Sequence, residues 1–315
     1  MGIGDATSAD EALPAEVAAL GVGGVILLGP NVADAAQVRA LIDGLRQRAP
    51  RTLLVSVDEE GGRVSRLRPI IGPTPSARAL GQRSMAEIVG VAADRGTSLR
   101  NLGFDLVLAP VVDADGGPGG GAIGDRSFAA TPAEAGLRAG AFVEGLGRSG
   151  VSAAAKHFPG QGDLADSHDG PVVFEAPLDE VVRAAGTGFG PALDAGAPAV
   201  MMSHVSFPAL GPLPASMEPA AYRLLRSFGF DGVAITDAMN MSAIVERWPL
   251  PEATVMALVA GADLVLATPG HQAPAMQDAV VDAVGDGRLS EARLDEAVAR
   301  VLALRGEDPT TMICP

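Results

Sequence analysis

A single cysteine, Cys314, is present, which excludes an intramolecular disulfide and any cluster of cysteines around a metal. Lysine and arginine form no cluster and the formal net charge is −15. We therefore expect no nucleic-acid partner, because binding phosphates requires a basic face. No apolar run approaches the ~18 residues that span a membrane, and the first 14 residues lack the basic and apolar regions of a secretory signal peptide. We expect a protein without membrane contact in the cytoplasm, or outside the cell if a leader has been removed.

Aromatic residues make up only 3% of the chain, whereas apolar residues make up 48% and are mostly small aliphatics. A core of small aliphatic side chains suits a parallel sheet that is covered by helices. The 315 residues contain no Pro/Ser-rich linker, charge block or composition shift that would mark a domain boundary. We predict one catalytic domain over 1–315, with an atypical N-terminal segment at 1–20 and a C-terminal tail at 306–315. We also expect a monomer.

Short apolar strands alternate with amphipathic helices along the chain. The predicted strands lie in 22–29, 51–58, 104–113, 151–158, 197–204, 231–237 and 262–269. The predicted helices cover 35–47, 85–101, 132–148, 178–195, 219–228, 251–260, 271–286 and 290–305. This alternation predicts a parallel sheet, and the length favours a closed TIM-like (β/α)8 barrel over an open doubly wound sheet. Only "MGIG" is available for the first strand, which we expect to be short or missing.

Ionisable residues follow five of the predicted strands. They are Asp58, Glu59 and Glu60 after the second run, Asp113 after the third, Lys156 and His157 in the fourth, His204 after the fifth and Asp237 after the sixth. Each aspartate alone is equally well explained as a helix N-cap. The carboxyl ends of barrel strands meet at one rim, however, and barrel enzymes carry their active sites there. We therefore predict an active site at this rim, and we assign Glu59 and Glu60 to structure, with one of them pairing with Arg63.

Several common catalytic signatures are missing. The sequence has no G-x-S-x-G motif of serine hydrolases, no P-loop phosphate motif and no histidine pair at zinc-binding spacing on a helix. The glycine-dense segment 117–124 opens no helix, so we interpret it as a loop. We expect neither a metal nor another cofactor.

The segment "KHFPGQGDLADSHDGP" (156–171) concentrates ionisable side chains in a glycine-rich loop after a strand. Hydrolysis of a glycoside needs a proton donor for the leaving oxygen and an anion on the opposite face of the sugar. Asp237, fixed at a strand end, can supply the anion. His168 can give and take a proton near neutral pH, and Asp166 can orient its imidazole. The flanking glycines allow such a loop to move over a substrate.

Four segments together resemble a known family. In order and spacing, "VDEEGGRVSRL", "IGDRSF", "KHFPGQGDLADSH" and "ITDAMNM" resemble the signature segments of glycoside hydrolase family 3, in particular its single-domain bacterial β-N-acetylglucosaminidases. The resemblance covers roughly residues 20–305. It implies a TIM-like barrel, cleavage with retention of configuration, and terminal β-linked N-acetylglucosamine as the substrate. Such substrates typically occur on muropeptides during cell-wall recycling.

The resemblance also implies roles for single residues. Asp237 would be the nucleophile that forms a covalent glycosyl-enzyme, and His168, assisted by Asp166, would be the general acid/base. The sugar would be held by Asp58, Arg66, Arg126, Lys156 and His157. His204, at another strand end, remains a candidate either for the substrate pocket or for loop packing.

The sequence departs from the family pattern at two positions. Gln161 stands where the family usually has histidine, and Ala238 follows the nucleophile where an acidic residue is usual. Four alternatives stay open: a β-glucosidase or xylosidase of the same family, a phosphorylase, a sugar-binding barrel without turnover, and an aldolase-type barrel with Lys156 as a Schiff-base lysine.

Overall fold

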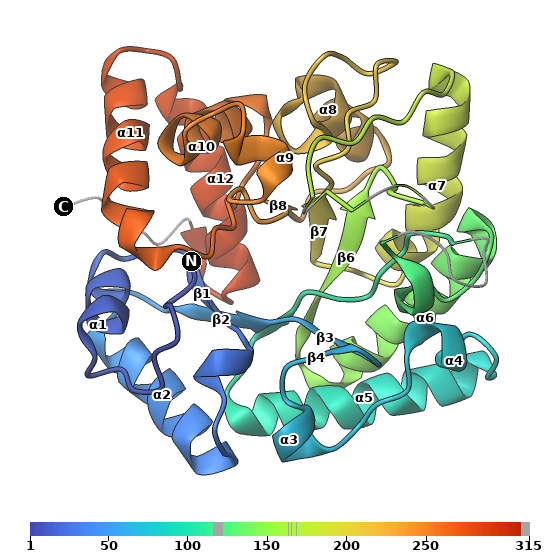
Figure 1. The fold of residues 1–315 in the computed structure, drawn as a ribbon, viewed down its shortest axis with the longest axis horizontal. Helices are drawn as coiled ribbons and strands as arrows, with labels where there is room; N and C mark the ends of the chain where they lie inside the picture. The colour runs from blue at the N-terminus through green and yellow to red at the C-terminus, as the bar shows by residue number, and fades with distance from the viewer. Residues whose placement is uncertain (116–121, 163, 165, 168, 310–315) are drawn as a thin grey trace.

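The computed structural model describes residues 1–115, 122–162, 164, 166–167 and 169–309. A curled parallel sheet lies at its centre, with neighbouring strands in the order β1–β2–β5–β6–β7–β8 (Figure 1). The strands are β1 (Gly24–Leu27), β2 (Leu54–Val57), β5 (Leu106–Val107), β6 (Ser152–Phe158), β7 (Ala199–Met202) and β8 (Val233–Thr236). Each lies inside a predicted apolar run. The TIM-like barrel predicted from the sequence is therefore confirmed.

Two very short segments close the barrel. Leu264 forms a parallel bridge with Ile235 of β8, and Gly2 forms one with Ile26 of β1. The N–H of Gly2 also donates to the carbonyl of Ala267 at 2.8 Å, so the two segments are hydrogen-bonded to each other. Only glycine fits at position 2, because a Cβ there would lie 2.3 Å from a backbone oxygen. The first strand is thus present but short, as the sequence predicts.

The barrel interior is packed with side chains. The inward-facing cluster comprises Ile26, Leu54, Leu106, Leu108, Ala154, Ala199, Met201, Val233, Ile235 and Leu266. Alternate residues of the same strands, such as Val25 and Val55, instead belong to the core between the barrel and its helices. Because both faces of each strand are buried, the strands appear in the sequence as continuous apolar runs.

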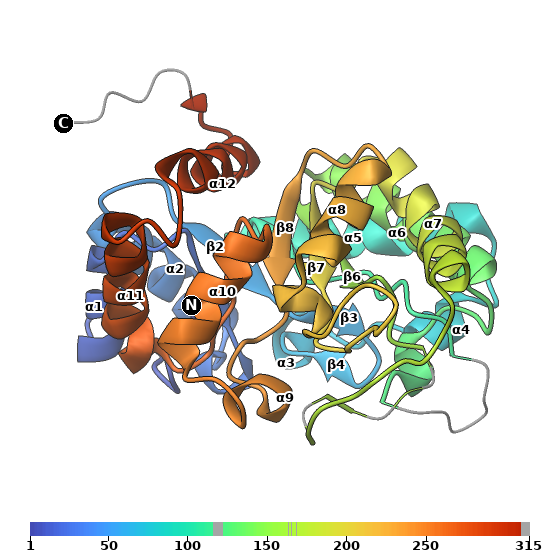
Figure 2. The same ribbon diagram turned by 90° about the horizontal axis from the view of Figure 1, so that it is seen from above.

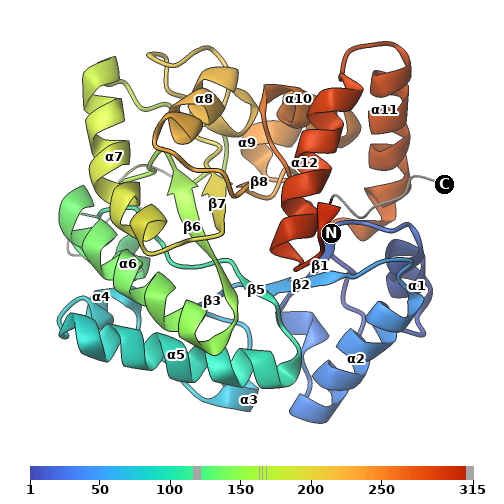
Figure 3. The same cartoon turned by 180° about the vertical axis from the view of Figure 1, so that it is seen from behind.

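Helices surround the barrel (Figures 1 and 3). The longer ones are α1 (Ala12–Ala19), α2 (Ala35–Arg48), α5 (Met85–Leu102), α6 (Pro132–Ser149), α7 (Leu178–Asp194), α8 (Pro219–Ser227), α10 (Leu250–Ala260), α11 (Ala273–Gly285) and α12 (Glu291–Leu304). Short helical turns are α3 (Arg68–Ile71), α4 (Ala77–Leu80), α9 (Ser242–Val245), η1 (Gly29–Asn31), η2 (Gly124–Arg126), η3 (Ala215–Met217) and η4 (Gly270–Gln272). A two-stranded hairpin, β3 (Glu59–Gly61) and β4 (Val64–Ser65), follows β2.

Local signals fix the helix ends. Asp34, Ser84 and Thr131 precede α2, α5 and α6, and each side chain accepts a hydrogen bond from a backbone N–H of the first turn. Helix α5 ends at Gly103, which adopts the left-handed conformation that favours glycine. The eight predicted helices therefore match the observed ones to within two residues at each end.

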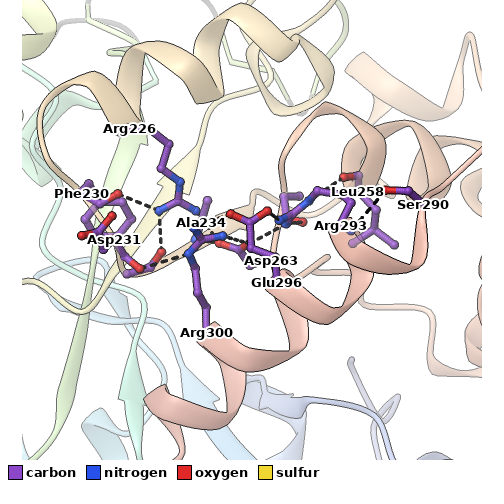
Figure 4. A network of polar contacts seen from close by, with 12 residues as sticks. Arg226, Phe230, Asp231, Ala234, Leu258, Asp263, Ser290, Arg293, Glu296 and Arg300 are labelled. Atoms are coloured by element: carbon purple, nitrogen blue, oxygen red, sulfur yellow. Dashed lines mark hydrogen bonds and ion pairs between the residues drawn. The ribbon is translucent and has the colours of Figure 1, made fainter. Parts of the chain in front are cut away.

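The helix α12 crosses the end of the barrel at which the strands begin, as Figures 2 and 3 show. Its Val301 packs with the cluster of the barrel interior. Figure 4 shows Arg226, Arg293 and Arg300 converging on the carboxylate of Asp263, with contacts of 2.6, 2.6 and 3.2 Å. The Asp263 side chain is fully buried. These ion pairs tie α12 to the barrel.

A cavity of about 450 Å³ lies at this same end, between the beginnings of the strands and α10, α11 and α12. Its lining is mainly apolar and contains none of the predicted site residues. The chemistry expected from the sequence therefore belongs to the opposite end of the barrel. Across the described ranges, no helix combines the length and apolar character needed to cross a bilayer.

Candidate active site

Predicted site residues from four strands meet where the strands end. The Nζ atom of Lys156, in β6, lies 2.9 Å from Oδ1 of Asp58, which follows β2. The Nε2 atom of His157 lies 3.9 Å from Oδ2 of Asp237, which follows β8. His204, which follows β7, contacts the segment after Asp237. The rim predicted from the sequence therefore exists as a connected group of ionisable side chains.

An irregularity in β6 brings two consecutive residues to this group. The pairing register between β6 and β7 shifts between Lys156 and Phe158. In a regular strand, neighbouring side chains point to opposite faces. Here Lys156 contacts Asp58 while the next residue, His157, approaches Asp237. Register irregularities of this kind re-aim side chains next to active sites.

Glu60 links two of the predicted cations. Its Oε1 atom lies 2.6 Å from Nζ of Lys156 and accepts a hydrogen bond from Nη2 of Arg126 at 2.9 Å. Its Oε2 atom accepts from Nε of Arg126 at 2.7 Å, which completes a bidentate pair. Together with Asp58, the group contains two carboxylates and two cations.

The charges in this group stabilise one another. Burial would raise the pKa of the Glu60 carboxyl, but Lys156 and Arg126 lower it to about 2. Burial would lower the pKa of Lys156, but Asp58 and Glu60 hold it above its ordinary value. Burial acts in the same direction on Arg126, and Glu60 outweighs it, so the Arg126 pKa is also raised. All three groups are therefore charged at neutral pH.

Asp113 organises the backbone and the ring of His157. Its Oδ2 atom accepts a hydrogen bond from the backbone N–H of His157 at 3.0 Å and lies 2.6 Å from Nδ1 of the same residue. Its Oδ1 atom accepts from the backbone N–H of Gln161 at 2.6 Å. Gln161, at the position where the family usually has histidine, is itself buried. The Asp113 carboxylate therefore positions both His157, a predicted sugar ligand, and the backbone of Gln161.

Asp237 is held as an anion at the end of β8. Its Oδ1 atom accepts a hydrogen bond from the N–H of Ala238 at 2.7 Å. Burial would raise the pKa of Asp237, but His157, His204, the Ala238 N–H and Lys156 together hold it below its usual value. Its side chain keeps 16% of its surface exposed, so the carboxylate is mostly buried but still accessible to solvent.

His204 supports the segment that carries Asp237. Its Nε2 atom lies 3.0 Å from the carbonyl oxygen of Ala238, which can only accept, so this nitrogen carries the proton. Its Nδ1 atom lies 2.8 Å from Oγ of Ser216. The ring is only 1% exposed. These contacts fit a role in positioning the segment after Asp237.

His168 lies outside the described residues, so its predicted role remains a prediction. Its neighbour Ser167 is described and only 2% exposed. The carbonyl of Ser167 accepts a hydrogen bond from the N–H of Ala243 at 3.3 Å, in the helix that follows Asp237. Asp166 is described and has at least one interaction partner. Ser167 therefore lies next to the helix that follows Asp237.

Arg66 directly follows β4. Its Nε atom is buried and has no hydrogen-bond partner among the described residues. No ion pair within the described ranges connects it to the other predicted sugar ligands. Its predicted contact with substrate stays a prediction.

The sequence interpretation missed two residues of this group. Glu60 was assigned to structure, and Asp113 was noted only as a strand-end residue without a role. The expected pairing of a glutamate with Arg63 is wrong, because Arg63 lies 3.1 Å from Asp125. Glu59 instead contacts Arg95 at 3.5 Å. The available signal was position, since both missed residues lie at or just after the ends of apolar runs in the sequence that lead to the rim.

The comparisons with known proteins agree with this fold. Residues 5–304 match the model of the glycosyl hydrolase family 3 N terminal domain. The β-hexosaminidase LpqI of Mycobacterium tuberculosis (strain ATCC 25618 / H37Rv) is 39% identical over 320 residues, covering 98% of this chain and 81% of the relative.

Two solved structures are similar along nearly the whole chain. A glycoside hydrolase family 3 β-N-acetylglucosaminidase from Paenibacillus sp. str. FPU-7 superposes with a TM-score of 0.90 at 33% identity, covering 98% of this chain and 61% of that one. This chain thus spans about three fifths of the Paenibacillus chain. The β-N-acetylhexosaminidase from Beutenbergia cavernae DSM 12333 gives a TM-score of 0.87 at 31% identity, covering 96% and 94%. The chain therefore belongs to glycosyl hydrolase family 3.

Proposed function

We propose that the chain is a retaining, exo-acting β-N-acetylglucosaminidase. It hydrolyses terminal β-linked N-acetylglucosamine through a covalent glycosyl-enzyme on Asp237, with His168 as general acid/base. The enzyme class is supported by the family and by the β-hexosaminidase and β-N-acetylglucosaminidase relatives. The assignment of roles rests on the site geometry together with the motifs in the sequence.

The observation that carries the proposal is the state of Asp237. A nucleophilic carboxylate must be ionised, fixed and accessible to the anomeric carbon. Asp237 is held below its usual pKa, is fixed by the Ala238 N–H, and remains partly exposed. Cationic and hydrogen-bonding groups from other strands surround it, which suits a site that receives a polar sugar.

The position of Ser167 supports His168 as the proton donor. Ser167 is hydrogen-bonded to the helix that begins five residues after Asp237, and His168 is its neighbour in the chain. A retaining glycosidase needs its two catalytic groups on opposite sides of one glycosidic bond. Histidine can protonate the leaving oxygen and then activate water, because it titrates near neutral pH.

The ion pairs weaken two of the alternatives. A Schiff-base lysine needs a neutral amine, whereas Asp58 and Glu60 raise the pKa of Lys156 and keep it charged. A phosphorylase must bind a phosphate anion, whereas Lys156 and Arg126 are already paired with carboxylates. Neutral sugar hydroxyls, which both donate and accept hydrogen bonds, fit this set of charges better. Product analysis with and without phosphate separates hydrolysis from phosphorolysis.

The decisive experiment traps the intermediate. The protein is incubated with a slow fluorinated N-acetylglucosamine analogue, digested and analysed by mass spectrometry. A sugar adduct on the peptide that contains Asp237 is expected, and none on Asp237→Ala. An adduct on another carboxylate would remove Asp237 from the nucleophile role. Equal inactivity of wild type and Asp237→Ala on a chromogenic N-acetylglucosaminide, with sugar still bound, would favour a binding protein.

The biological setting belongs to the same proposal. We infer that one catalytic domain acts as a monomer in the cytoplasm on muropeptides released during cell-wall recycling. Assay of purified muropeptides tests the substrate, and light scattering tests the monomer. Fractionation of cells that express the natural gene tests the location.

A further inference from the structure

We propose that Glu60 is a positioning residue that holds Lys156 and Arg126 in the geometry that binds the sugar. This inference rests on the proposed function and deepens it. Within the described residues, Glu60 contacts both cations, through Lys156 Nζ at 2.6 Å and Arg126 Nε at 2.7 Å. Neither the family match nor the motifs assign it a role.

Glu60 itself presents almost no surface to a substrate. Its side chain is only 4% exposed. Oε1 already contacts Lys156 and Arg126, and Oε2 accepts from Arg126. Asp58, the other carboxylate of the group, keeps 20% of its side chain exposed, and among the described residues it contacts Lys156 through Oδ1. Glu60 therefore acts on substrate through its partners, whereas Asp58 retains an exposed carboxylate.

Removing the charge of Glu60 would disturb both partners. Lys156 and Arg126 repel each other, and Glu60 is the carboxylate that contacts both of them and offsets this repulsion. Without it, Lys156 would turn fully to Asp58 and compete with the sugar for that carboxylate. Arg126 would lose a bidentate partner that fixes the plane of its guanidinium group. A displacement of about 1 Å at such groups costs about 100-fold in turnover.

Glu59 offers a matched control within the same hairpin. It is 1% exposed and also carries several contacts. Its carboxylate accepts from Oγ of Ser65 and from the N–H of Leu67, and lies 3.5 Å from Arg95. None of these partners belongs to the predicted site. The two adjacent buried glutamates thus have different roles. Glu59 stabilises the β3–β4 hairpin, whereas Glu60 positions Lys156 and Arg126.

The test compares Glu60→Gln with Glu59→Gln. Thermal unfolding, kcat and KM on a chromogenic N-acetylglucosaminide, and the Kd of free N-acetylglucosamine are measured for both variants. We expect Glu60→Gln to lose about 100-fold in kcat/KM and to bind the sugar more weakly. We expect Glu59→Gln to unfold at a lower temperature while its kcat/KM stays within about 3-fold of wild type.

A second variant covers the case in which Glu60→Gln does not fold. Glu60→Asp keeps the negative charge, so this variant should fold. Its side chain is too short to contact both cations, so we expect a loss in kcat/KM between those of wild type and Glu60→Gln. Sugar binding at wild-type strength in Glu60→Asp or Glu60→Gln would overturn the inference. Equal losses in kcat/KM for Glu59→Gln and Glu60→Gln, with equal losses in thermal stability, would also overturn it.

The sugar Kd separates this inference from the proposed function. If the wild-type protein binds N-acetylglucosamine but does not hydrolyse its glycosides, the proposed activity is wrong. The effect of Glu60→Gln on sugar binding would then still decide the positioning role.

Discussion

The Nδ1 atom of His157 lies 2.6 Å from Oδ2 of Asp113, on the side of the ring opposite Asp237. A carboxylate only accepts, so Nδ1 carries the proton in this pair. The backbone N–H of His157 donates to the same oxygen. Asp113 therefore fixes both the orientation and the tautomer of a ring that faces the proposed nucleophile, as orienting carboxylates do in hydrolase triads.

The first prediction concerns Asp113→Asn. The amide has one oxygen where the carboxylate has two, so its NH2 group must face either His157 or the N–H of Gln161, and both present donors. We expect kcat/KM to fall by about 100-fold. Steady-state kinetics on a chromogenic substrate measures the loss.

Asp115→Asn is the control for the Asp113 variant, because Asp115 is equally buried but its carboxylate lies 3.7 Å from Arg78. A comparable loss of kcat/KM in both variants would show that Asp113 matters only for packing.

The sequence predicted the barrel because its determinants are local. Strands buried on both faces appear as apolar runs, and caps such as Ser84 and Gly103 mark helix ends. Helix α1 and the β3–β4 hairpin were not predicted, since they are short and their stability depends on packing. The first strand was recognisable only as "MGIG", because closure depends on a single residue, Gly2.

The candidate site was predictable in its position but not in its internal pairing. Strand ends identified Lys156, His157 and Asp237, because barrel topology brings such residues to one rim. Whether Glu59 or Glu60 contacts the cations depends on the direction in which each side chain points. Both lie in a hairpin whose register shifts between Glu59 and Gly61. That register is a tertiary property, so the sequence alone could not show that Glu60 faces the cations.

The second prediction is a pH dependence of stability due to Glu60. Lys156 and Arg126 lower its pKa from the ordinary value of 4.5 to about 2 in the folded protein. The unfolded chain therefore binds a proton that the folded chain does not, so this contribution is fully present above about pH 4.5 and is lost as the pH falls toward 2. Glu60→Gln lacks this titration.

Denaturant unfolding of wild type and Glu60→Gln at several pH values tests this linkage. We expect the difference in their free energies of unfolding to narrow steadily between pH 5 and pH 3. Glu144→Gln, at an exposed ion pair with Arg148, controls for the loss of a surface charge. A difference between wild type and Glu60→Gln that stays constant over this pH range would contradict the prediction.

The third prediction concerns the opposite end of the barrel. Asp263→Ala leaves Arg226, Arg293 and Arg300 without their shared buried carboxylate. Breaking a buried ion-pair network in this way costs about 3–5 kcal/mol. We expect the free energy of unfolding to fall by this amount, with kcat/KM nearly unchanged below the unfolding transition.

Asp286→Ala breaks an exposed ion pair with Arg288 and should leave the free energy of unfolding nearly unchanged. Chemical denaturation of both variants distinguishes the two cases. A loss for Asp263→Ala no larger than that for Asp286→Ala would mean that α12 is held by apolar packing, through residues such as Val301, and not by the arginine cluster.

The fourth prediction tests His168 as the proton donor. Departure of an alkoxide needs protonation, whereas a dinitrophenolate departs readily without it. His168→Ala should therefore lose about 100-fold or more in kcat/KM on alkyl N-acetylglucosaminides and much less on the dinitrophenyl glycoside. His271→Ala, at an exposed histidine beside α11, should behave as wild type on both substrates. Equal losses on the two substrates for His168→Ala would assign the proton donor role to another residue.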